Sequence, residues 1–211
     1  MSLRDHSLDD RITKAAFGEF FDKGYRGASL RKIAEAAGVT VGAIQIRYRS
    51  KDELFVCLLK PFLDDIDTVF EDTKADYFAE GDTDTLTRLQ ASMKKESAAI
   101  VRLIFDHYES AILLLCRSAG SSLENYFDAI VQRKIKESIS FFRSVDFPFI
   151  DERLLGLLIS AQFDSYRRIV TECPDRETAE AYTDAMMTYH FGGWTALFTS
   201  NDKAYRSRED M

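Results

Sequence analysis

Residues 29–51 read SLRKIAEAAGVTVGAIQIRYRSK. Two short segments with helical apolar spacing, Leu30–Ala37 and Val41–Arg47, flank a turn that contains Gly38. Glycine accepts the left-handed backbone that ends many helices, so the chain can reverse direction sharply there. The stretch therefore predicts a helix-turn-helix, in which the second helix is short enough to lie in the major groove of DNA.

Capping residues extend this pattern on both sides. Ser29 and Thr40 precede the two segments, and hydroxyl side chains at such positions cap helices. Ser50 and Glu53 form the S-x-x-E pattern of a capping box, which predicts that a further helix begins there. Upstream, Leu8–Lys23 has apolar residues on one helical stripe and is followed by glycine. The first sixty residues are thus predicted to be helical almost throughout.

The rest of the 211-residue chain also has helical periodicity. Pro61 should kink the helix that the capping box opens, or start a new segment, because proline lacks an amide proton. Ten glycines and three prolines leave few turn residues for a many-stranded sheet protein. We therefore expect an all-α fold, with the later helices at roughly 85–107, 108–118, 122–145, 151–172 and 176–199.

Charge is distributed unevenly. The formal net charge is −7, from 28 basic and 35 acidic residues. Residues 1–60 hold 11 Lys and Arg against 8 Asp and Glu, whereas residues 61–211 hold 17 against 27. A basic head on an acidic body is typical of a nucleic-acid-binding domain attached to a separate acidic domain.

The head resembles the N-terminal domain of the TetR family of transcriptional regulators. The resemblance runs from Leu8 to Leu54 without a gap. Its positions are Gly24-Tyr25, Ser29, Ile33-Ala34, Ala37-Gly38-Val39, Gly42, Ile44, Tyr48 and Ser50-Lys51-Asp52-Glu53-Leu54. The resemblance implies a three-helix DNA-binding domain over residues 1–53 and a helical effector-binding and dimerisation domain over 54–200. The polar composition of residues 201–211 predicts a tail.

The family's DNA contacts carry over by position. Arg31 matches a residue that reaches a base edge or a phosphate, Lys51 matches a basic residue that contacts phosphate, and Tyr48 matches an aromatic that supports the helix from within. Gln45 departs from the usual Tyr and can donate to phosphate or read adenine. The full set implied is Ser29, Arg31, Thr40, Val41, Gly42, Ala43, Gln45, Ile46, Arg47, Tyr48 and Lys51, with Arg49 able to share the phosphate contacts.

The resemblance also implies a homodimer and an effector site. The segments 151–172 and 176–199 are apolar on more than one face, so one face can meet the protomer's core and another a partner, although a single large core would also fit. Aromatic residues expected near an effector are Phe105, Tyr108, Tyr126, Phe127, Phe142, Phe163 and Tyr166, for which ordinary packing is the alternative. An apolar or cationic ligand would suit such walls.

Several other functions are not indicated. No catalytic motif occurs, and His6, His107 and His190 lie far apart in sequence, so we expect no enzyme, no metal and no cofactor. Cys57, Cys116 and Cys173 have no metal or redox spacing, and no secretory signal is visible. We therefore expect a cytoplasmic protein with reduced thiols.

These observations predict a sequence-specific DNA-binding transcriptional regulator. By resemblance it is a repressor that a small-molecule effector releases from a pseudo-palindromic operator. Two alternatives remain open: a DNA-architectural protein without ligand-controlled regulation, and a helical small-molecule-binding protein whose head does not read DNA.

Overall fold

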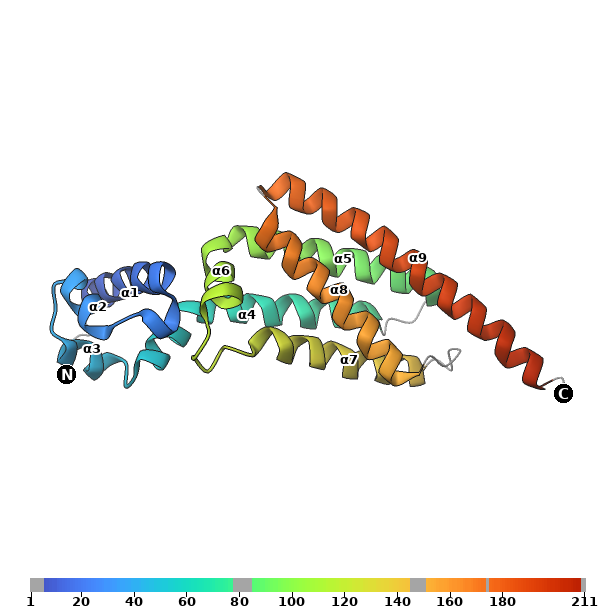
Figure 1. The fold of residues 1–211 in the computed structure, drawn as a ribbon, viewed down its shortest axis with the longest axis horizontal. Helices are drawn as coiled ribbons and strands as arrows, with labels where there is room; N and C mark the ends of the chain where they lie inside the picture. Colours follow the sequence, from blue (N-terminus) through green and yellow to red (C-terminus); the bar gives the residue numbers. More distant parts are fainter. Residues whose placement is uncertain (1–5, 78–84, 145–150, 174, 210–211) are drawn as a thin grey trace. The chain divides into compact units, whose positions relative to one another are not determined.

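The structure is a computed structural model, which describes residues 6–77, 85–144, 151–173 and 175–209. Within these residues the chain forms nine α-helices and no strand, as expected from the sequence (Figure 1). The helices are α1 (His6–Gly27), α2 (Leu30–Ala37), α3 (Val41–Arg47), α4 (Lys51–Tyr77), α5 (Thr85–Asp106), α6 (Tyr108–Arg117), α7 (Tyr126–Ser144), α8 (Glu152–Glu172) and α9 (Arg176–Glu209).

Four helices differ from the prediction at their ends or interiors. The helix α1 continues to Gly27 rather than ending at Lys23, and Gly24, with φ 66° and ψ 167°, kinks it instead of ending it. The helix α7 begins at Tyr126 rather than near residue 122, because residues 118–126 form successive backbone turns, such as Glu124 N to Ser121 O at 3.2 Å. The helix α9 continues to Glu209 because no glycine or proline interrupts residues 194–209. The helix α4 continues through Pro61, which lies at an exposed position where water can satisfy freed backbone groups.

The chain divides into two compact units. Unit 1 comprises Met1–Asp64 and His107–Phe127, and unit 2 comprises Asp65–Asp106 and Asp128–Met211. The domain boundaries predicted from sequence, after residues 53 and 200, fall inside α4 and α9 respectively. These two domain boundaries therefore remain predictions.

Unit 1 is built around the predicted helix-turn-helix. The helix α1 packs on α2 and α6, and α2 packs on α3. The predicted inward residues of α2 and α3 are buried: Ile33, Ala34, Ala37 and Ile44. Beneath them, the Phe20 and Phe55 rings meet edge to face with centroids 4.9 Å apart, and both side chains are fully buried. This core fixes the direction in which α3 faces outward.

Gly38 forms the turn between α2 and α3. Its φ of 65° and ψ of 40° lie in the left-handed region. Its amide bonds to Glu35 O at 3.2 Å, and the amide of Val39 bonds to Ala34 O at 2.9 Å. These bonds satisfy carbonyl groups that the end of a helix leaves unpaired, which is the Schellman arrangement.

Unit 2 has two apolar clusters. One gathers Leu89, Phe141, Leu155, Ile159, Trp194 and Phe198, and the other Val101, Ile169 and Ala179. The helix α9 contacts both α5 and α8. None of the helices in the described ranges is long and apolar enough to cross a membrane.

Replacing Gly38 with Ala should lower the free energy of unfolding by about 1–2 kcal/mol, because an L side chain is disfavoured in the left-handed region. Gly18 offers a matched control, since it lies exposed in α1 with open space around it. Gly18→Ala should raise stability by roughly 0.5–1 kcal/mol. Urea unfolding measures both. Equal effects of the two substitutions would contradict the assigned role of Gly38.

Candidate nucleic-acid interface

The helix α3 has one buried and one open face. Thr40 caps it as predicted, because its side chain accepts a hydrogen bond from the amide of Ala43 at 3.1 Å. Ile44 and Tyr48 are buried. Of the candidate DNA contacts, Val41 and Ala43 are half-buried, whereas Gly42, Gln45 and Ile46 are exposed. Side chains on the open face can therefore meet a partner without disturbing the core.

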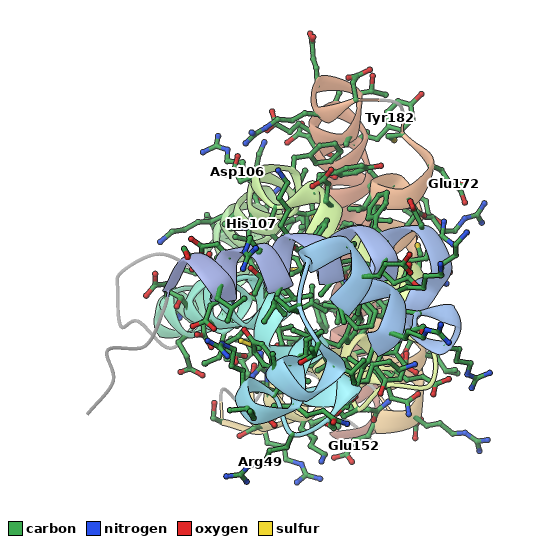
Figure 2. All side chains as sticks on the ribbon, turned by 90° about the vertical axis from the view of Figure 1, so that its left-hand side faces the viewer. Arg49, Asp106, His107, Glu152, Glu172 and Tyr182 are labelled. Carbon is green, nitrogen blue, oxygen red and sulfur yellow. The ribbon has the colours of Figure 1, made fainter. Side chains whose placement is uncertain are left out.

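Two arginines at the end of α3 differ in their surroundings. The Arg47 Nε atom lies 2.6 Å from Asp9 Oδ1 of α1, and the two side chains are only 18% and 17% exposed. Arg47 thus forms an internal ion pair that ties α3 to α1. Arg49 is exposed, and its side chain extends away from the ribbon (Figure 2).

Lys51 is also bonded within unit 1. Its Nζ atom donates to Tyr25 O at 2.7 Å and to Ala28 O at 3.1 Å, and lies 4.4 Å from the centre of the Tyr25 ring. Burial raises the pKa of Tyr25, and the nearby charge of Asp52 and a hydrogen bond to it act in the same direction. Lys51 therefore joins the start of α4 to the end of α1.

The cap predictions are confirmed only in part. The Ser50 hydroxyl accepts from the amide of Glu53 at 2.9 Å, as a capping box requires. The Glu53 carboxylate, however, accepts from the amide of Arg49 at 2.6 Å, one residue before the expected position. The predicted side-chain cap by Ser29 is wrong: its hydroxyl makes no cap bond, and its own amide donates to Glu19 Oε1 at 3.1 Å. Ser29 is half-buried, and Arg31 is exposed on α2.

Unit 2 contains a buried ion pair that the sequence analysis missed. Lys134 Nζ of α7 lies 2.5 Å from Glu96 Oε2 of α5, with both side chains about one-tenth exposed. Thr73 Oγ1 of α4 lies 3.2 Å from the same oxygen, and Lys134 Nζ lies 5.1 Å from the centre of the Phe70 ring. Three helices thus meet at one charged pair. The available signal was a Glu and a Lys within the apolar stripes of amphipathic helices.

A second polar group joins α8 to α9. The Gln162 amide donates to the Tyr166 hydroxyl at 3.0 Å, the Tyr166 hydroxyl donates to the sulfur of Met187, and Trp194 Nε1 lies 3.4 Å from Gln162 Oε1. Burial raises the pKa of Tyr166, and the charge of Glu96 adds to this, against the effect of the Gln162 bond. Tyr166 of α8 is therefore hydrogen-bonded to α9 and is affected by the charge of Glu96 on α5.

His190 belongs to the same region. Its ring centre lies 6.4 Å from that of Tyr166, and burial lowers its pKa. Its Nε2 atom is buried and has no hydrogen-bond partner within the described part of the chain. Buried polar atoms are nearly always bonded, so this nitrogen is a place where a bound molecule could supply a partner.

The aromatic residues predicted for an effector site divide between the units. Tyr108, Tyr126 and Phe127 belong to unit 1. In unit 2, Phe105 and Tyr166 pack on the Val101 cluster, whereas Phe142 and Phe163 pack on the Trp194 cluster. The Phe163 and Tyr166 rings have centroids 6.2 Å apart. The structure therefore associates four of the seven within one unit.

The helices α8 and α9 also carry large exposed apolar side chains, which we call the α8–α9 outer face. Its members are Leu154 (42% exposed), Leu157 (64%), Tyr182 (57%) and Tyr189 (73%). Tyr182 lies on α9 in the upper part of Figure 2. Ala161, Ala185, Gly192, Gly193 and Ala196 are exposed on the same helices. Such a face is typical of a protein–protein contact.

Comparison with known proteins agrees with this geometry. Residues 12–57 match the family model "Bacterial regulatory proteins, tetR family". A TetR-like transcriptional regulator from Rhodococcus sp. RHA1 has 16% identity and a TM-score of 0.61, covering 91% of this chain and 100% of that one. Residues 12–57 of this chain are therefore similar in sequence to the DNA-binding domain of that family.

Two further solved structures show the same fold over most of their lengths. The regulator FadR from Bacillus subtilis, in complex with stearoyl-CoA, has 17% identity and a TM-score of 0.59, over 88% of this chain and 98% of that one. NalD, the secondary repressor of the MexAB-OprM efflux pump in Pseudomonas aeruginosa, has 22% identity and a TM-score of 0.60, over 88% and 96%. The chain as a whole thus has the fold of TetR-family transcriptional regulators.

Removing one partner of the buried ion pair should be strongly destabilising. Lys134→Met leaves Glu96 without its positively charged partner, and we expect a loss of about 3–5 kcal/mol in the free energy of unfolding. Adding Glu96→Gln should recover much of that loss, since no buried charge is then unpaired. Lys94→Met is the matched control: Lys94 Nζ lies 2.8 Å from Asp184 Oδ1 with both side chains more than half exposed, so about 0–1 kcal/mol is expected. A double variant as unstable as Lys134→Met would contradict this.

Acid should destabilise the protein partly through His190. Because burial lowers its pKa below the value of 6.5 in the unfolded chain, the unfolded chain binds the proton more readily. The stability that depends on the neutral ring is complete above that value and is lost as the pH falls below it. His190→Gln should therefore reduce the loss of stability on acidification from about pH 7.5 to 5.5, whereas the difference between the two proteins should stay constant above pH 7.5. Parallel pH profiles would refute this.

Proposed function

We propose that this chain is a homodimeric transcriptional repressor that binds a pseudo-palindromic DNA operator and is released by a small-molecule effector. The observation that carries the proposal is the open face of α3, where Gly42, Gln45 and Ile46 are exposed on a helix whose other face is buried. A helix held in this way can enter the major groove with its core contacts intact.

The proposed DNA contacts fall into two groups. Arg31, Gly42, Gln45, Ile46 and Arg49 are exposed and would contact DNA directly. The remaining residues proposed for the interface are half-buried, buried or bonded within unit 1, and would mainly position those contacts: Ser29, Thr40, Val41, Ala43, Arg47, Tyr48 and Lys51. Backbone amides at the starts of α3 and α4 add positive helix ends near phosphate.

The α8–α9 outer face supports the dimer. Leu157 and Tyr189 are 64% and 73% exposed, and exposed Gly and Ala on α9 would allow another backbone to approach. A symmetric contact through this face would give two reading heads related by a two-fold axis, which matches a pseudo-palindromic site.

The interior of unit 2 supports the effector site. Buried polar groups around Glu96, Gln162 and His190 lie among aromatic side chains, and a polar or charged group on a ligand could bond to them. FadR, which has this fold, was solved with stearoyl-CoA, so small-molecule binding fits. The effector would favour a conformation of the dimer that binds the operator less well, and by linkage the operator would weaken effector binding.

The test begins with selection of genomic DNA fragments by the purified protein, followed by binding across a salt series. Recovery of a pseudo-palindrome with affinity that falls steeply with salt is expected. Small molecules can then be screened for release of that site. Enrichment without any releasing molecule would favour an architectural role, and no enrichment would favour a helical small-molecule-binding protein.

The dimer contact has its own test. Leu157→Glu should convert the dimer to a monomer in sedimentation, because a charge would be buried at the contact. Operator affinity should fall by at least about tenfold, since one head then binds alone. Gln132→Glu adds the same charge at an exposed position on α7 and should change neither quantity. A Leu157→Glu protein that stays dimeric would reject this face as the interface.

A further inference from the structure

The side chain of Ile46 is the most exposed large apolar group among the described residues, at 85%. It lies on α3, one residue after Gln45 and one before Arg47. Isoleucine at such a position contributes nothing to the core of unit 1. It also loses rotamer freedom in a helix, so it is not favoured there by helix propensity.

The other groups that α3 can present are few. The helix reads VGAIQIR, in which Arg47 is the only charged residue. The Arg47 guanidinium bonds to Asp9 Oδ1 at 2.6 Å, and its Nη1 atom lies 3.4 Å from Ala43 O. Gly42 has no side chain, and Val41 and Ala43 are half-buried. The open face of α3 therefore offers one amide, from Gln45, and one branched aliphatic group, from Ile46.

This pair of groups matches one type of base pair. In the major groove, the thymine 5-methyl is the apolar group that a base edge presents, and adenine offers N6 and N7 to a glutamine amide. Guanine is read most often by Arg or Lys, and the one such residue on α3 is held by Asp9. Adjacent helical residues point about 100° apart, so Gln45 and Ile46 suit neighbouring base pairs rather than one.

We propose that α3 reads A·T base pairs, with Ile46 contacting the 5-methyl group of a thymine in each half-site and Gln45 hydrogen-bonding an adenine next to it. The inference rests on the proposed DNA-binding function. In it, Arg47 is a positioning residue: its ion pair with Asp9 holds α3 against α1 and keeps a guanidinium off the base edges. Arg31, on α2, lies outside this assignment.

The test uses the operator that the unaltered protein selects from random-sequence duplexes. Each thymine is replaced in turn by deoxyuridine, which removes only the 5-methyl group. At one thymine in each half-site, the replacement should weaken binding roughly fourfold, as expected for burial of one methyl group. At the other thymines it should have little effect.

Protein variants identify the residue responsible. Ile46→Ala should bind the thymine and deoxyuridine duplexes equally. Gln45→Ala is the matched control: it should keep the sensitivity to the methyl group but lose discrimination against 7-deazaadenine at the neighbouring adenine. Both positions are exposed, so neither substitution removes a core contact.

Each outcome has a defined meaning. Methyl sensitivity that disappears with Ile46→Ala supports the assignment. Selected half-sites without the methyl effect, or the same effect in Ile46→Ala, overturn it while leaving DNA reading intact. Failure to select any site overturns the proposed function and this assignment with it.

Discussion

The packing of α3 onto unit 1 is the constraint on which the interface depends. A seven-residue helix is too short to persist alone in water, because nucleation fixes several residues before hydrogen bonds compensate. Its stability must come from the burial of Ile44 and Tyr48, the Thr40 cap and the Arg47–Asp9 ion pair. These contacts occupy the inner face and both ends of the helix. Gln45 and Ile46 lie on the outer face, where substitutions do not affect the core packing, so DNA recognition alone can determine which residues occupy these positions.

Unit 2 combines apolar clusters with polar side chains that are buried in its interior. Its apolar clusters supply the hydrophobic burial, but Glu96, Lys134 and Gln162 are nearly enclosed within it. Buried ion pairs are weak evidence of stability, because desolvation opposes their attraction. Replacing a buried ion pair by apolar side chains of similar size is often neutral or stabilising. The retention of charge in this interior is therefore better explained by specificity, either for one packing arrangement or for a polar ligand.

The features that the sequence predicted correctly are local ones. The Gly38 turn and the Ser50 cap depend on residues three to five positions apart, and the buried face of α2 follows from helical spacing. For the same reason the all-α fold and the approximate positions of most helices in the described part of the chain could be anticipated.

The features that escaped prediction join distant residues. The Arg47–Asp9 and Lys134–Glu96 pairs each span 38 residues, and the bond from the Ser122 amide to Asp52 spans 70. The residues next to Arg47 in sequence do not indicate that Asp9 is its partner. Arg47 was therefore predicted to be a phosphate contact. The same applies to the aromatic residues predicted for an effector site, because residue type alone does not indicate to which unit each one belongs.

The Asp9–Arg47 pair also bears on how new specificities could arise. Exchange of recognition helices between related proteins assumes that residues 41–47 form a self-contained cassette. In this chain the cassette ends in a guanidinium whose partner lies on α1, 38 positions earlier. If α3 of this chain were moved into a related protein, Arg47 would lose its ion-pair partner. If a foreign α3 without this arginine were placed here, the largely buried Asp9 carboxylate would lose its partner. An exchange that keeps this ion pair must therefore move α1 and α3 together.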